Sequence, residues 1–209
     1  MISPVLDRRR LVRRGVVLAW FTVAWNSMEG IAGIGSGLVA GSIALVGFGV
    51  DSYVEVFAAS VILWRLGRER HGHELSEAAE RRAVRLIAIT FLVLGAGVGV
   101  ESIRKLAVGA EPDESWFGIG LAIVSLVVMP LLARAKRRVG EQLGSRAVTA
   151  DATETALCVW LSAIVLTGLA ANSVFGWWWA DPLAGLGIVY VAGREGIEHL
   201  RSDDLDECC

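Results

Sequence analysis

The sequence predicts an all-α membrane protein with six transmembrane helices, and three observations support this fold class. Hydrophobic residues make up 54% of the 209-residue chain without counting its 24 glycines, more than in ordinary soluble domains. These residues gather in long apolar runs that polar or glycine-rich breaks separate. The basic residues are concentrated in alternate breaks, which is typical of a chain that crosses a bilayer several times.

Six apolar spans follow one another along the chain. They cover residues 15–35, 41–64, 83–103, 116–133, 147–171 and 180–200. A helix of about 20 apolar residues crosses the hydrocarbon core of a bilayer, so each run can form one transmembrane helix. We expect a basic cytoplasmic N-terminus over residues 1–14, one transmembrane domain over 15–201 and a short acidic cytoplasmic tail over 202–209. Glycine spacings such as Gly33-x3-Gly37 predict close packing between the helices.

The charge distribution predicts the orientation. All but two of the 20 basic residues lie before span one, between spans two and three, between spans four and five, or in the tail. Only Arg104 and Lys105 fall on the other side. The positive-inside rule therefore predicts that both termini are cytoplasmic, in a multi-pass protein of the plasma (inner) membrane. Three consecutive tryptophans, residues 177–179, fit an interfacial belt on the outer side.

The second span carries two carboxylates, Asp51 and Glu55, four residues apart. On a helix this spacing places both side chains on one face. A carboxylate at the centre of a bilayer costs about 2.5 to 3.5 kcal/mol on insertion scales, so two on one stripe need partners or a function. They are either satisfied by neighbouring hydroxyls or a buried Arg, or they form half of a cation site.

A second cluster lies in span five, where Glu154 and Cys158 are again four residues apart, with Asp151 one turn before Glu154. Asp51 and Glu55 from one helix and Glu154 and Cys158 from another give four ligands, the number that a tetrahedral divalent metal site needs. Cys158 has a second interpretation, because a free cysteine in an apolar helix also serves as a small packing residue.

The chain resembles the transmembrane domain of the cation diffusion facilitators, which are six-helix proton-coupled exporters of zinc and related divalent metals. The resemblance is seen first in the second span. The second helix of that family carries a Ser, then Ala-Leu, then an acid or His followed four residues later by Asp. The matching positions in this chain are Ser42, Ala44, Leu45, Asp51 and Glu55.

The resemblance continues through the rest of the chain, from about Trp20 to Arg201. In the fifth helix the family has a Ser, an Asp, then a His with an Asp four residues on, against Ser145, Asp151, Glu154 and Cys158 here. The segment WADPLAGLGIVYVA opens span six as in the family, and RHGHELSEAAE is similar to the family's Gly-His loop.

Three departures from the family limit what the resemblance implies. Glu154 and Cys158 replace the His and Asp of the fifth helix, and Glu55 replaces an Asp of the second. The metal need not be zinc, because carboxylates suit Mn, Fe and Zn whereas a thiolate favours Zn, Cd or Fe(II).

The third departure is at the end of the chain. Many members also carry a soluble metal-binding domain after helix six. Here only REGIEHLRSDDLDECC follows, so we expect no regulation or dimerisation through such a domain.

The resemblance implies a transporter that exports a divalent cation (Zn, Fe, Mn or Cd) from the cytoplasm in exchange for protons, as a homodimer. The alternative is a metal-binding or sensing membrane subunit without transport activity. We expect no enzyme activity, organic cofactor or nucleic-acid partner, because the chain has no phosphate-binding glycine loop and no Ser/His/Asp arrangement.

Other polar residues have two interpretations each. Asn26 and Glu29 in span one either line the cation path or hydrogen-bond to span two. His71 and His73 either bind metal in the cytoplasmic loop or belong to a solvated charged helix. Asp181, which precedes Pro182, is expected to cap the N-terminus of its own helix.

Overall fold

The computed structural model describes residues 4–70 and 77–206, and in this part of the chain it contains six α-helices and no strand. The all-α fold class is therefore confirmed. The helices are α1 (Pro4–Ala40), α2 (Ile43–Arg70), α3 (Glu77–Val108), α4 (Trp116–Leu143), α5 (Arg146–Phe175) and α6 (Ala180–Asp206). Each predicted span lies within one helix, apart from Gly41 and Ser42, which form the turn before α2.

The helices are longer than the apolar spans that predicted them. The first helix starts at Pro4, well before residue 15, and α4 runs ten residues beyond residue 133. Both extensions are rich in Arg and include Leu, and both residues have high helix propensity. A helix therefore continues through these charged segments although the hydropathy falls.

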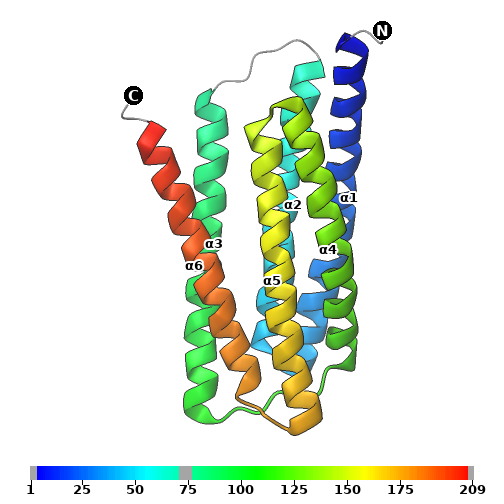
Figure 1. The fold of residues 1–209 in the computed structure, drawn as a ribbon. Helices are drawn as coiled ribbons and strands as arrows, with labels where there is room; N and C mark the ends of the chain where they lie inside the picture. Colours follow the sequence, from blue (N-terminus) through cyan, green and yellow to red (C-terminus); the bar gives the residue numbers. More distant parts are fainter. Residues whose placement is uncertain (1–3, 71–76, 207–209) are drawn as a thin grey trace.

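The six helices form one antiparallel bundle in which the start of α1 and the end of α6 lie at the same end (Figure 1). Within it α1 packs against α2, α4 against α5 and α3 against α6. The α2 helix also contacts α3, α5 and α6, so it lies at the centre of the bundle. Side chains on α2 can therefore meet those of several neighbours.

Glycines allow α1 and α2 to approach closely, as their spacing predicted. A Cβ atom at Gly33 would lie 3.0 Å from the Cα of Gly49, and one at Gly37 would lie 2.7 Å from the backbone N of Val46. Any larger side chain at Gly37 would require the two helices to separate. This close contact brings the polar residues of α1 next to those of α2.

At the end of the bundle opposite the termini, Asp181 of α6 holds the start of α2. Its carboxylate accepts hydrogen bonds from the Ser42 hydroxyl and, at 2.9 Å, from the Ile43 backbone N–H. The prediction that Asp181 caps its own helix is wrong, because α6 already begins at Ala180 and the carboxylate is directed to another helix. Lys105 of α3 donates to the Gly41 carbonyl in the same turn.

Three helices, α2, α4 and α5, contain segments long and apolar enough to cross a membrane. These segments are Ile43–Gly67, Trp116–Leu143 and Ala147–Phe175. The same criterion selects no further helix within the described residues, so the count of six transmembrane spans stays a prediction. The three selected helices include both of those that carry the predicted metal ligands.

Candidate metal centre

Asp51 and Glu55 lie on the buried face of α2, with only 3% and 5% of their surfaces exposed. The Asn26 amide of α1 donates a hydrogen bond of 2.7 Å to Glu55 Oε2. The two carboxylates therefore point into the bundle, as the four-residue spacing predicted.

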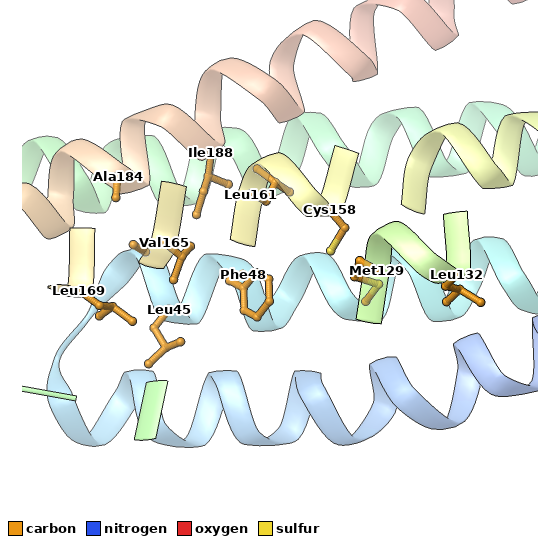
Figure 2. Close-up of a cluster of buried hydrophobic side chains, with 11 residues drawn as sticks. Leu45, Phe48, Met129, Leu132, Cys158, Leu161, Val165, Leu169, Ala184 and Ile188 are labelled. Carbon is orange, nitrogen blue, oxygen red and sulfur yellow. The ribbon is translucent and has the colours of Figure 1, made fainter. Parts of the chain in front are cut away.

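Cys158 of α5 faces Asp51 across the bundle. The two side chains lie close enough to interact, and the thiol is buried. Cys158 also belongs to the hydrophobic core, where it packs with Phe48, Met129 and Leu161, and its sulfur is directed toward α2 (Figure 2). Both interpretations of Cys158, as a metal ligand and as a packing residue, are compatible with this position.

Glu154 lies one turn before Cys158 on α5 and is half-buried. Its carboxylate is within electrostatic range of Asp51. Among the described residues, no group of three or more His, Cys, Asp and Glu side chains has the arrangement of a metal centre. The structure thus brings Asp51 and Cys158 together, while the full four-ligand site stays a prediction.

The Glu29 carboxylate of α1 lies one helical turn from Asn26 and accepts a hydrogen bond of 3.1 Å from the Ser52 hydroxyl of α2. Together with the bond from Asn26 to Glu55, this confirms the hydrogen-bond network that the sequence predicted as one alternative. Two further hydroxyls lie on α4 and α5, where Ser162 donates to Ser125 at 3.1 Å. Sequence reasoning missed these serines, since single serines in apolar helices show no distinctive spacing.

Lys136, which the sequence groups with the basic residues between spans four and five, lies buried inside the bundle. Its ammonium is 2.9 Å from Asp151 Oδ2 and donates to the Thr155 hydroxyl at 2.8 Å. A signal in the sequence could have shown this, because the buried positions of α4 recur every three or four residues on one face. They include Met129, Leu132, Ala133, Lys136, Val139, Gly140 and Leu143.

One predicted feature, the tryptophan cluster, lies away from this site. Trp177 and Trp179 are partly exposed and stacked, with ring centroids 5.2 Å apart, in the connection between α5 and α6 at the end of the bundle opposite the termini. This location agrees with an interfacial belt. His71 and His73 fall outside the described residues.

Residues 19–203 match the model of the cation efflux transmembrane domain family. The chain belongs to this family. This confirms the resemblance to the cation diffusion facilitators that the residues of spans two and five indicated.

Several curated relatives are similar to this cation efflux domain over most of its length. The magnetosome protein MamB of Paramagnetospirillum magneticum is 31% identical over 173 residues, which cover 78% of this chain and 56% of MamB. An uncharacterized transporter of Synechocystis is 29% identical over 80% of this chain and 56% of its own. The cation-efflux pump FieF of Shewanella oneidensis is 25% identical over 81% of this chain and 61% of the pump. The chain therefore spans roughly half to three fifths of the length of these relatives.

Proposed function

We propose that this cation efflux domain transports a divalent metal cation out of the cytoplasm in exchange for protons, through a site between α2 and α5. The observation that carries this proposal is the contact between Asp51 and Cys158. It joins the two helices on which the sequence places pairs of potential ligands four residues apart.

The proposed ligands are Asp51, Glu55, Glu154 and Cys158. Three carboxylates and one thiolate can bind Zn, Fe, Mn or Cd, because oxygen ligands suit the harder of these ions and sulfur the softer ones. The Glu154 side chain is half-buried and would have to turn inward to complete the site.

Exchange with protons follows from the chemistry of these ligands. A carboxylate or a thiolate binds metal only in its deprotonated form, so metal and protons compete for the same atoms. In an alternating-access cycle the ligands would bind metal on the cytoplasmic side, and protonation from outside would release it. Burial of Asp51 and Glu55 excludes water from the site, so that exchange requires the helices to rearrange.

We propose that both termini are cytoplasmic. We also propose that the protein resides in the plasma (inner) membrane and works as a homodimer. The charge asymmetry along the sequence supports the orientation. The start of α1 and the end of α6 lie at one end of the bundle, which agrees with this orientation (Figure 1).

Metal-dependent proton flux in liposomes tests the transport proposal. Full-length protein is reconstituted with a pH dye inside the vesicles, and Zn²⁺ or Mn²⁺ is added outside. We expect each metal to drive proton movement that Asp51→Ala abolishes. Glu101→Gln is the control, because Glu101 lies away from the site and pairs with Arg104. Metal binding without flux would instead support the metal-binding or sensing subunit.

A further inference from the structure

Three buried oxygen atoms between α1 and α2 lack hydrogen-bond partners among the described residues. They are Asn26 Oδ1, Glu29 Oε1 and Glu55 Oε1. The exposed fractions of these side chains are 0%, 1% and 5%. Buried polar atoms are nearly always paired, so three orphaned oxygens on neighbouring side chains call for water or a cation between them.

The three side chains are held together by two hydrogen bonds. On α1, Asn26 and Glu29 are one turn apart, and on α2 so are Ser52 and Glu55. The bond from Asn26 to Glu55 is 2.7 Å long, and that from Ser52 to Glu29 is 3.1 Å long. Residues three apart on a helix are neighbours on its surface, so all three free oxygens belong to one cluster of side chains.

The electrostatics of the cluster favour a cation. Glu29 and Glu55 are within electrostatic range of each other, which makes the pair unfavourable when both are ionised and nothing positive lies between them. The Lys136 ammonium also acts on Glu55, but it is already bound to Asp151 at 2.9 Å. The Ser125 hydroxyl and the Trp25 indole lie near Glu29, yet neither satisfies Oε1.

We propose that Asn26, Glu29 and Glu55 form an all-oxygen binding station for a hard divalent cation between α1 and α2. It lies beside the Asp51 and Cys158 pair and shares Glu55 with it. The inference rests on the proposed function in that the ion reaching this station is the transported cation. Carboxylate and amide oxygens without sulfur or nitrogen suit Mn²⁺ and similar ions better than Cd²⁺.

In this station Glu29 is a metal ligand from α1, a helix that contributes no ligand to the site between α2 and α5. A cation moving between α1, α2 and α5 would exchange the thiolate of Cys158 for the Glu29 carboxylate while keeping Glu55 as a common ligand. Hard ions would favour the α1 side, and softer ions the Cys158 side. Metal preference thus depends on both sides of α2.

The test is Mn²⁺ binding to the purified full chain in lipid nanodiscs, measured by electron paramagnetic resonance. We expect Glu29→Gln to weaken Mn²⁺ binding by at least about tenfold, as loss of a metal ligand does. Zn²⁺ affinity, measured by competition with a chelating dye, should fall by a smaller factor than Mn²⁺ affinity, because Asp51, Glu55 and Cys158 are unchanged. Asp181→Asn is the matched control, since both oxygens of that buried carboxylate are hydrogen-bonded.

Several outcomes would overturn the station. These are no Mn²⁺ binding to the wild-type protein, an unchanged Mn²⁺ affinity in Glu29→Gln, or an equal loss for both metals. If Glu29→Gln does not fold, Asn26→Ala decides, and an unchanged Mn²⁺ affinity in that variant overturns the proposal. Failure of the transport proposal is seen in a different variant. If Asp51→Asn bound zinc as tightly as the wild type, the site between α2 and α5 would be refuted, while the comparison at Glu29 would still stand.

Discussion

The ammonium of Lys136 lies 2.9 Å from the carboxylate of Asp151, and both side chains are buried, with exposed fractions of 2% and 6%. The pair joins α4 to α5, and Thr155 satisfies a further proton of the ammonium at 2.8 Å. Buried ions lose their hydration, so each partner depends on the other for compensation. This relationship fixes the packing of α4 against α5, the helix that carries Glu154 and Cys158.

Lys136→Met should therefore destabilise the protein by about 3 to 5 kcal/mol, because it leaves the Asp151 carboxylate buried and unpaired. The double variant Lys136→Met with Asp151→Leu should recover most of this loss. Denaturant unfolding of the purified protein in detergent, followed by tryptophan fluorescence, measures both effects. A double variant no more stable than Lys136→Met would show that the ion pair is not the source of the loss.

The sequence predicted the six helices because apolar runs and charged breaks are local features. It did not predict the partners of Lys136 and Asp181, since each partner lies on another element and depends on how the helices pack. Asp181 bonds Ser42, 139 positions earlier in the chain. The spacing of Asp51 and Glu55 predicted a shared buried face, and the structure confirms this burial. No spacing could predict that Asp51 meets Cys158 while Glu154 stays half-buried, because that depends on the rotation of α5 against α2.

A second prediction concerns Asp181, whose loss leaves the Ser42 hydroxyl and the Ile43 N–H without their acceptor. Asp181→Ala should lower the free energy of unfolding by about 1 to 3 kcal/mol, the cost of a buried unsatisfied donor. Metal affinity should change little, because the residue lies at the end of the bundle. Asp113→Ala, an exposed acid at the same end, is the control in thermal unfolding. Equal melting temperatures for the two variants would contradict the assigned role.

The membrane orientation is open to a direct test. A reporter fused after Cys209 should report a cytoplasmic location, and one inserted near Pro112 an external location, because the basic residues are concentrated on the side of the termini. Enzymatic reporters active on only one side of the membrane give the answer in whole cells. The reverse result for either fusion would refute the six-span topology.

The proposed ligands should be essential for transport and dispensable for membrane insertion. We expect Asp51→Ala and Glu154→Ala each to reduce metal transport to background, because each variant loses both a metal ligand and a proton acceptor. Protein amounts in the membrane fraction should match the wild type. Glu101→Gln serves as the control, because Glu101 lies on α3 and pairs with Arg104 of the same helix. Wild-type transport by the Asp51→Ala protein would contradict the site.

The last prediction concerns Cys158, whose two interpretations give opposite results. If the thiolate binds metal, Cys158→Ser should weaken zinc and cadmium transport far more than manganese transport, because a hydroxyl is a harder and much less acidic ligand. Cys158→Asp should then retain transport and shift preference toward harder ions. If Cys158 only packs against Phe48 and Met129, the Ser variant should affect all metals alike.

The Asp variant separates these cases further, since a packing position in the hydrophobic core would not tolerate a carboxylate. In that case Cys158→Asp should reduce the amount of folded protein, whereas a ligand position next to Asp51 would hold the new carboxylate through bound metal. Transport of zinc and manganese, measured side by side in both variants and normalised to folded protein, decides between them. Equal losses for the two metals would remove Cys158 from the site and leave three carboxylates, Asp51, Glu55 and Glu154, to bind the ion with water.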